Sequence, residues 1–122
     1  MIIGNGVDIT EVDRIKKNLD NKRFLFKIYS ESEITYLKNR KFNSQTAAGM
    51  FAAKEAVSKC LGTGFTNFGP KDIEILKDDK GKPYVNLRNN ARERATQLEL
   101  TNIQLSISHT KDYAIAFCIV EK

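Results

Sequence analysis

The alternation of apolar and polar positions predicts strands at both ends of the chain. Met1–Val7 is an apolar run with two glycines that ends at Asp8, which indicates a short buried strand with a carboxylate at its C-terminal end. Near the C-terminus, apolar residues at 103, 105 and 107 alternate with polar ones. Tyr113–Val120 is almost wholly apolar, which is typical of a strand covered on both faces.

Helical patterns dominate the rest of the first half. A capping-box-like start at Thr10 predicts a short basic helix that continues to about Asn21. The S-x-x-E pattern that begins at Ser30 predicts a second helix over residues 30–40. A third helix is expected over residues 44–61, because two glycines follow it closely.

The second half favours β structure around one small helix. Apolar runs at 73–76 and 84–87 bracket the turn sequence KDDKGK and predict a hairpin, and residues 90–98 are rich in helix formers. The chain has 122 residues and shows neither a repeat nor a linker. Helices in the first half and strands in the second therefore predict one α+β domain over residues 1–122, with the helices packed on a mostly antiparallel sheet.

Charge adds a preference for anionic partners. The formal net charge is +5 and the pI is about 9.2, which suits nucleic acid, a membrane surface, a phosphorylated ligand or an acidic protein. Cys60 and Cys118 lie in apolar segments without metal-ligand spacing, and we interpret both as small buried hydrophobes. No apolar run has the length of a membrane span, and Asp8 comes too early for a signal peptide. These features predict a cytoplasmic protein that is not bound to a membrane.

The third helix carries the most informative polar face. At 3.6 residues per turn, Lys54, Glu55, Ser58 and Lys59 share one arc, and Phe51 lies in the middle of it. A large aromatic side chain there needs a cover, either another element or another subunit, that would partly desolvate the charges. The alternative is that Glu55 and Lys59 form an exposed i, i+4 pair that contributes roughly 0.2 to 0.5 kcal/mol.

Two further segments have side chains that suit a phosphate. His109 is the only histidine, and Thr110 and a lysine follow it in a turn, so an imidazole, a hydroxyl and an ammonium lie close together. A lone histidine at a strand end is more often structural. The loop Gly62-Thr63-Gly64 is phosphate-like, but it matches no Walker pattern and lies at the wrong end of its helix.

Four motifs, taken together, resemble the bacterial holo-acyl-carrier-protein synthase family. They are GVDITE from Gly6, FAAKEAVSK from Phe51 with the following GTG, GKPY from Gly81, and SISHTKDYA from Ser106. The resemblance covers nearly the whole chain and implies a 4′-phosphopantetheinyl transferase-like fold. It also implies transfer of 4′-phosphopantetheine from coenzyme A to a serine of apo acyl carrier protein, a step that serves fatty acid biosynthesis. The reaction would be Mg²⁺-dependent and release adenosine 3′,5′-bisphosphate.

The same resemblance assigns expected roles to individual residues. Asp8 and Glu55 correspond to the metal ligands, and with Lys59, which contacts the phosphates, they form the expected catalytic set. Because members of this family form homotrimers with active sites between subunits, the resemblance also implies a homotrimer. Besides Lys59, the residues expected to bind coenzyme A are Gly62, Thr63, Gly64, Pro83, His109 and Thr110. The residues expected to bind acyl carrier protein are Arg14, Lys17 and Arg23.

Two questions stay open at this level. Family members often carry an arginine where this sequence has Met50, so either another cation such as Arg40 or Lys41 substitutes for it or affinity for coenzyme A is lower. Glu55, directly or through a metal-bound water, is the best candidate within the motif for the general base.

The main alternative from another functional class is a basic module for RNA or DNA. The high pI and the lysines and arginines of the N-terminal segment favour it. The sequence lacks an RNP pattern, zinc-finger cysteines and a GXXG clamp on a suitable scaffold. We therefore expect no nucleic-acid partner.

Overall fold

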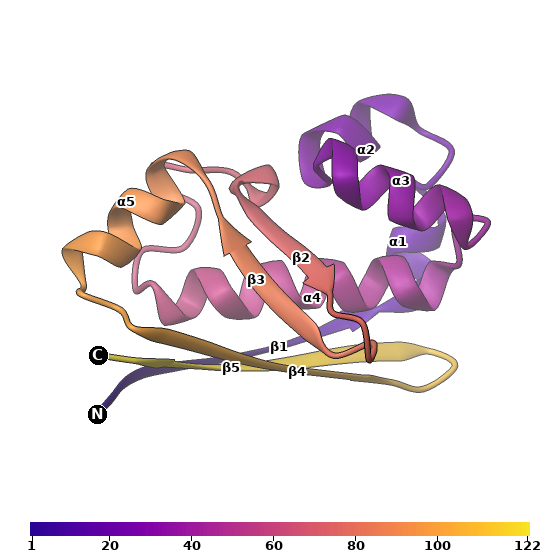
Figure 1. The fold of residues 1–122 in the computed structure, drawn as a ribbon. Coiled ribbons are helices and arrows are strands. Elements are labelled where there is room, and N and C mark those ends of the chain that lie inside the picture. Colours follow the sequence, from indigo (N-terminus) through magenta and orange to yellow (C-terminus); the bar gives the residue numbers. More distant parts are fainter.

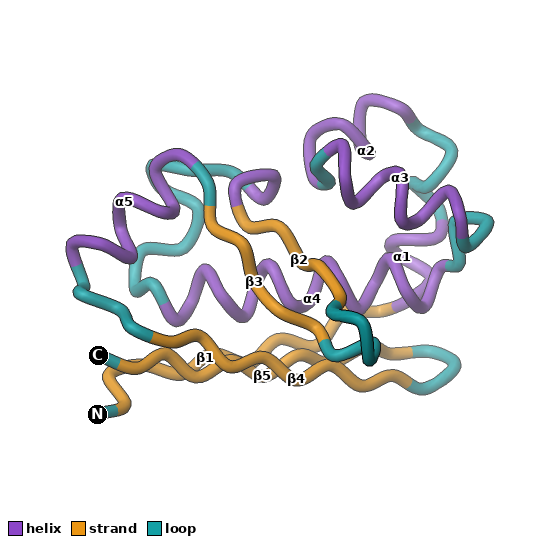
Figure 2. Tube along the Cα trace, viewed as in Figure 1, coloured by secondary structure: helices purple, strands orange, loops and turns teal.

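A three-stranded antiparallel sheet joins the two ends of the chain in the computed structural model, which describes residues 1–122 (Figures 1 and 2). Strand β5 (Tyr113–Glu121) lies in the centre and pairs with β1 (Ile2–Glu11) on one side and β4 (Asn102–His109) on the other. The two termini meet at one end of the sheet, where the amino group of Met1 donates to the carbonyl oxygen of Lys122 over 3.1 Å.

One long helix, α4 (Ser44–Cys60), lies across one face of this sheet (Figure 1). Its sheet-facing positions are small, and Ala52, Ala53 and Ala56 are fully buried. Strand β1 approaches α4 so closely at Gly6 that a Cβ there would lie 2.1 Å from the carbonyl oxygen of Ala56. Only glycine permits this approach, which brings the side chains of β1 against the helix.

A second layer covers the opposite side of α4. It contains the antiparallel hairpin of β2 (Ile73–Lys77) and β3 (Pro83–Leu87), which follows a short 3-10 turn, η1 (Pro70–Asp72). In Figure 1, α4 runs between the sheet and this layer, with the remaining helices at the two ends of the hairpin. Those helices are α1 (Val12–Lys16), α2 (Lys22–Ile28), α3 (Glu31–Asn39) and α5 (Asn89–Gln97).

Most expected elements are confirmed. The structure is α+β, with the hairpin, the helix at 44–61, the small helix near 90–98 and the two C-terminal strands close to their expected bounds. Helix α3 begins with a complete capping box, in which the Ser30 hydroxyl and the Glu33 carboxylate each accept a backbone N–H. Cys60 and Cys118 are buried as expected. No helix is both long and apolar enough to cross a lipid bilayer.

The N-terminal segment corrects two predictions. Strand β1 continues to Glu11, so Asp8 lies inside the strand rather than at its end. The expected helix from Thr10 shortens to α1, because the Thr10 hydroxyl donates to the Asp8 carboxylate and caps no helix. The next helix, α2, was not predicted, and its start is marked by the Asn21 side chain, which accepts two backbone N–H groups.

Strand β5 is not covered on both faces within one chain. Its side chains alternate between buried positions toward α4 and exposed positions on the outer face of the sheet. The outer positions of β5 and its neighbour β1 are nevertheless large and apolar, which is why the sequence looked continuously hydrophobic. This outer apolar face consists of Val7, Ile9, Tyr113, Ile115 and Phe117.

Candidate active site

Two carboxylates and one ammonium group gather where β1 crosses α4. Asp8 comes from the strand face that looks toward the helix, and its carboxylate accepts from the Thr10 hydroxyl over 2.8 Å. Lys59, from the last turn of α4, donates to the carbonyl oxygen of Val7 over 2.7 Å and lies 3.5 Å from the other Asp8 oxygen. Because Thr10 and Lys59 hold its two oxygens, the Asp8 carboxylate has a fixed orientation.

Glu55 lies one helical turn before Lys59 and is close enough to Asp8 and Lys59 to interact with their charges. Partial burial raises the pKa of its carboxyl, and the negative charge of Asp8 raises it further, whereas Lys59 and Arg14 act to lower it. Two carboxylates therefore share one site, and the positive charges of Lys59 and Arg14 do not fully offset the burial of Glu55 and its repulsion by Asp8. No third acidic, histidine or cysteine side chain joins them to complete an all-protein metal site.

Arg14 provides the cover that the sequence required for Phe51. Its guanidinium lies over the Phe51 ring, 5.4 Å from the ring centroid, and Phe51 is buried. The cover therefore comes from α1 of the same chain. Lys54 departs from the expected polar arc, because it is fully buried on the hairpin side of α4, away from the arc of Glu55 and Lys59.

The raised pKa of Glu55 gives a prediction for stability without metal. In buffer with a chelator at neutral pH, we expect Glu55→Gln to melt at a higher temperature than the wild type, because it removes a partly desolvated charge. The folded pKa lies above the unfolded one, so the folded wild type takes up a proton first and gains stability as pH falls. The difference in melting temperature should shrink on acidification, and a difference independent of pH between 7 and 4 would contradict the assignment.

A second site, here called the cofactor groove, lies between the hairpin and the N-terminal half of α4. It is a cavity of about 280 Å³, and its lining includes Tyr36 of α3, Met50 of α4, Lys77 and Pro83 of the hairpin, and His109 of β4. Gln45 also lines it, and its amide donates to the carbonyl oxygen of Thr110 over 3.2 Å. This arrangement offers an imidazole, an ammonium group and polar side chains around an apolar floor.

Lys77, Arg40 and Lys41 are the candidates for a cation that substitutes for an arginine at Met50, and a lower affinity for coenzyme A is the alternative. Lys77 lines the groove directly. Arg40 and Lys41 line an adjoining cavity that shares Thr46 with the groove, and the Arg40 guanidinium lies 3.7 Å from the centroid of the Tyr36 ring. Met50 itself is buried and contributes only apolar surface.

The residues expected to bind metal and coenzyme A fall into three groups within one chain. Asp8, Glu55 and Lys59 come together, and Pro83, His109 and Thr110 surround or adjoin the cofactor groove. Met50 in the groove and Glu55 are five residues apart on α4, which places their side chains about 140° apart around the helix axis, so these two groups lie on different sides of α4. The loop 62–64 lies beyond the opposite end of α4, and Thr63 lines a different cavity beside α5.

The residues expected to bind a partner lie on the helical end of the molecule. Arg14 in α1 lies beside the carboxylates, Lys17 follows α1 directly, and Arg23 lies in the first turn of α2. All three are exposed, and their charged groups form no ion pair.

Several contributors to these sites were not predicted from the sequence. Thr10 would have been recognised if β1 had been predicted at its full length, because residues two apart in a strand share a face. Tyr36, Gln45 and Lys77 carry no motif of their own. They belong to three elements that meet only in the tertiary structure.

The chain matches the model of a known family over most of its length. The family is described as the 4′-phosphopantetheinyl transferase superfamily, and residues 4–118 match. A holo-[acyl-carrier-protein] synthase of Clostridium botulinum strain Eklund 17B is 51% identical over 122 residues, which cover 99% of this chain and 98% of that protein. The synthase of Clostridium acetobutylicum shows the same identity and coverage.

Solved structures of such synthases share this fold. The Neisseria meningitidis holo-[acyl-carrier-protein] synthase superposes with a TM-score of 0.91 at 30% identity, covering 100% of both chains. The Bacillus anthracis synthase, in complex with CoA (3′,5′-ADP), gives a TM-score of 0.82 at 38% identity, covering 99% of this chain and 97% of that one. The Helicobacter pylori synthase in complex with coenzyme A gives 0.83 at 34% identity, covering 96% and 99%.

Proposed function

Since this chain belongs to the holo-[acyl-carrier-protein] synthase family of 4′-phosphopantetheinyl transferases, we propose that it moves 4′-phosphopantetheine from coenzyme A to a serine of apo acyl carrier protein, with Mg²⁺ and with release of adenosine 3′,5′-bisphosphate. The observation that carries this proposal is the grouping of Asp8, Glu55 and Lys59 where β1 crosses α4. The transferase domain would comprise residues 1–122 and serve fatty acid biosynthesis.

The donor set of this grouping fits magnesium. Mg²⁺ prefers oxygen ligands, keeps several waters, and is usually held by one or two carboxylates together with substrate phosphates. Asp8 and Glu55 provide two such carboxylates, and the repulsion that raises the pKa of Glu55 is a charge imbalance that a divalent cation would relieve. When bound there, Mg²⁺ would neutralise charge on the pyrophosphate of coenzyme A.

Lys59 is suited to hold a phosphate oxygen. Its side chain is 52% exposed, and its contacts with Val7 and Asp8 leave one N–H of the ammonium group without a protein partner. A phosphate oxygen that accepts this N–H gains charge stabilisation as the bond to phosphorus breaks. Asp8, held by Thr10, keeps the ammonium group in place.

Glu55 is the candidate general base for the serine hydroxyl. Its carboxylate lies beside Asp8, where the serine hydroxyl would arrive, so it would accept the hydroxyl proton directly or through an intervening water. The serine oxygen then attacks the phosphorus attached to pantetheine, and adenosine 3′,5′-bisphosphate leaves. No side chain of this enzyme needs to form a covalent intermediate.

The cofactor groove is the proposed site for the nucleotide end of coenzyme A. His109, Thr110 and Pro83 surround or adjoin it as the family resemblance implied, and Lys77 and Arg40 supply positive charge where Met50 replaces an arginine. The coenzyme A complexes of the Helicobacter pylori and Bacillus anthracis synthases support a coenzyme A site in this fold. The loop Gly62-Thr63-Gly64 is proposed as a further contact.

The outer apolar face supports assembly into a homotrimer with active sites between subunits. Its residues lie on adjacent strands, with Val7 opposite Phe117 and Ile9 opposite Ile115, so they form one continuous hydrophobic surface. His109 and Thr110 border a second cavity, of about 260 Å³, on this same face. A neighbouring subunit packed there would bring its own carboxylates toward these two residues and would reunite the groups that one chain keeps apart.

The exposed cations near the carboxylates suggest how acyl carrier protein docks. Arg14, Lys17 and Arg23 carry no ion pair, and α2 contains no acidic residue. An acidic carrier protein would be steered by this charge, and its serine would arrive beside Asp8 and Glu55.

This docking surface gives a kinetic prediction. Arg14→Glu should raise the KM for carrier protein about tenfold or more, since a reversed charge repels the partner, while affinity for coenzyme A changes little. The slope of kcat/KM against ionic strength should also flatten, because exposed charges are screened beyond roughly 8 Å at physiological salt. A wild-type kcat/KM that ignores salt, with a normal KM in the variant, would contradict this role.

Mass spectrometry of apo acyl carrier protein, incubated with the enzyme, coenzyme A and Mg²⁺, tests the reaction itself. We expect a mass gain equal to phosphopantetheine, and none when a chelator is present. A thermal shift with coenzyme A and Mg²⁺, set against one with oligonucleotides, separates this function from the nucleic-acid alternative. Stabilisation by oligonucleotides alone, without a mass gain, would overturn the proposal.

A further inference from the structure

A buried lysine on α4 takes no part in the proposed chemistry. Lys54 is fully buried, and its ammonium group donates to the Glu33 carboxylate over 2.7 Å and to the carbonyl oxygens of Pro70 and Ile73 over 2.9 and 2.7 Å. These three bonds use all its N–H groups. Burial lowers the pKa of Lys54, and the Glu33 charge opposes that shift.

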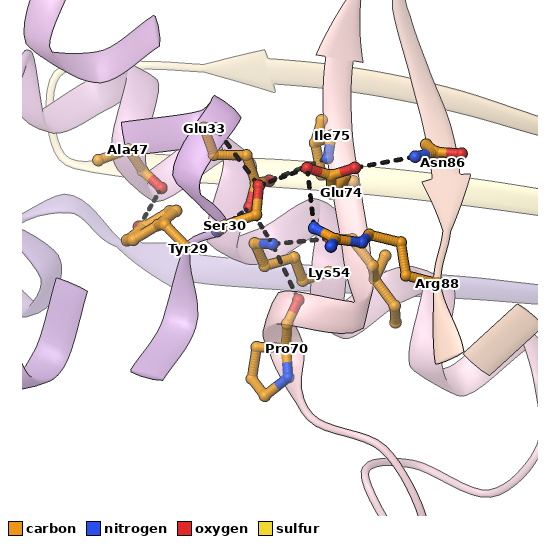
Figure 3. Close-up of polar contacts among 11 residues, drawn as sticks. Tyr29, Ser30, Glu33, Ala47, Lys54, Pro70, Glu74, Ile75, Asn86 and Arg88 are labelled. Carbon is orange, nitrogen blue, oxygen red and sulfur yellow. Dashed lines mark hydrogen bonds and ion pairs between the residues drawn. The ribbon is translucent and has the colours of Figure 1, made fainter. Parts of the chain in front are cut away.

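Glu33 is saturated in the same way, and the network continues into the hairpin (Figure 3). Besides Lys54, its carboxylate accepts the backbone N–H groups of Ser30 and Ile75 over 2.8 and 2.9 Å. The Ser30 hydroxyl donates to Glu74 of β2 over 2.6 Å, and the Glu74 carboxylate also accepts from Asn86 of β3. No buried side-chain polar atom is left without a partner.

Three elements joined by this network, namely α3, α4 and the hairpin, also supply walls of the cofactor groove. On α3, Glu33 lies three residues before Tyr36, and on α4, Lys54 lies four residues after Met50. These spacings place network and groove on the same face of each helix, one turn apart. On β2, the network residue Glu74 lies three residues before Lys77, which ends the strand and lines the groove.

We propose that the Lys54–Glu33 pair is a positioning device that fixes the distance between α3, α4 and the hairpin, and thereby sets affinity for coenzyme A. This inference rests on the proposed function, because it assigns the groove to coenzyme A. The carboxylates Asp8 and Glu55 are held separately, by the packing of β1 on α4 and by Thr10 and Lys59. Loss of the pair should therefore weaken binding in the groove more than the chemical step.

The test variant is Glu33→Gln, which keeps the shape of the side chain but removes the charge opposite Lys54. We expect the KM for coenzyme A to rise about tenfold, as when one well-aligned contact is weakened, with kcat at saturation within about twofold of wild type. In Lys54→Arg, which keeps the charge, the KM for coenzyme A should lie between that of the wild type and that of Glu33→Gln. Glu99→Gln, which removes an exposed ion pair to Lys122, is the matched control and should leave both constants unchanged.

Hydrogen exchange provides a readout that does not depend on activity. In Glu33→Gln, exchange should accelerate in β2 and β3 and in α3, while β1 and β5 keep wild-type protection. If Glu33→Gln fails to fold, Asn86→Leu, which removes only one outer bond to Glu74, should show the same pattern in weaker form.

The two proposals fail in different ways. Wild-type protein that neither binds nor uses coenzyme A would refute the proposed function, even if exchange localised to the hairpin and α3. The positioning role would be overturned if kcat and coenzyme A affinity fell equally, or if exchange accelerated uniformly across the sheet and the hairpin. Either result would mean that the Lys54–Glu33 pair only stabilises the fold as a whole.

Discussion

Asp8→Asn and Glu55→Gln are each expected to lower kcat by at least about 100-fold, the loss typical of removing one electrostatic contact to the transition state. Each substitution removes one of only two protein charges proposed to hold Mg²⁺. The measurement is the rate at which apo carrier protein gains the phosphopantetheine mass, at limiting and at saturating Mg²⁺.

The two variants should differ in detail. Asp8→Asn also weakens the contact that orients Lys59, so its defect should persist at high Mg²⁺ and include weaker coenzyme A binding. Glu55→Gln should retain coenzyme A affinity, because the contacts of Lys59 remain. Both should stay folded, and Glu99→Gln serves as the control for loss of a surface carboxylate. Near-normal rates in either variant at limiting Mg²⁺ would refute the proposed metal ligands.

Ile115→Glu is expected to convert the proposed trimer to monomers and to abolish most of the activity. Ile115 lies in the centre of the outer apolar face, opposite Ile9, and a glutamate there would place a charge among the apolar side chains of the proposed interface. An unpaired buried charge costs several kcal/mol in each interface. Light scattering measures the oligomeric state, and circular dichroism checks that the fold persists.

A matched control separates surface charge from interface disruption. Phe26→Glu makes the same kind of change at an exposed aromatic residue on α2, away from the sheet, and should leave the trimer intact. An Ile115→Glu variant with wild-type mass and activity would contradict both the interface and the placement of active sites between subunits. A monomer with full activity would contradict only the shared active site.

Local sequence patterns were sufficient to predict most of the helices and strands. The capping box at Ser30, the alanine-rich helix with its following glycines, and the KDDKGK turn are local signals, and the structure confirms each of them. The family was also recognisable, because its motifs are contiguous runs of residues. Asp8, Glu55 and Lys59 could be selected from those runs before their proximity was known.

The contacts of these residues depend on how distant elements pack against one another. Lys54 and Glu55 are neighbours on one helix with similar polarity, yet one is buried against the hairpin and the other faces β1. A single sequence cannot distinguish them, because their environments are supplied by residues at least 16 positions away in the chain. The continuous hydrophobicity of β5 likewise gave no indication that one of its faces is exposed in a single chain.

The close approach of β1 to α4 depends on the same kind of non-local fit. Gly6 is essential only because Ala56, fifty residues later, lies against it. The approach then places Asp8 beside Glu55 and Lys59. Local sequence patterns determine which elements form, whereas the packing of those elements determines which side chains meet, since burial and charge depend on partners that are distant in the chain.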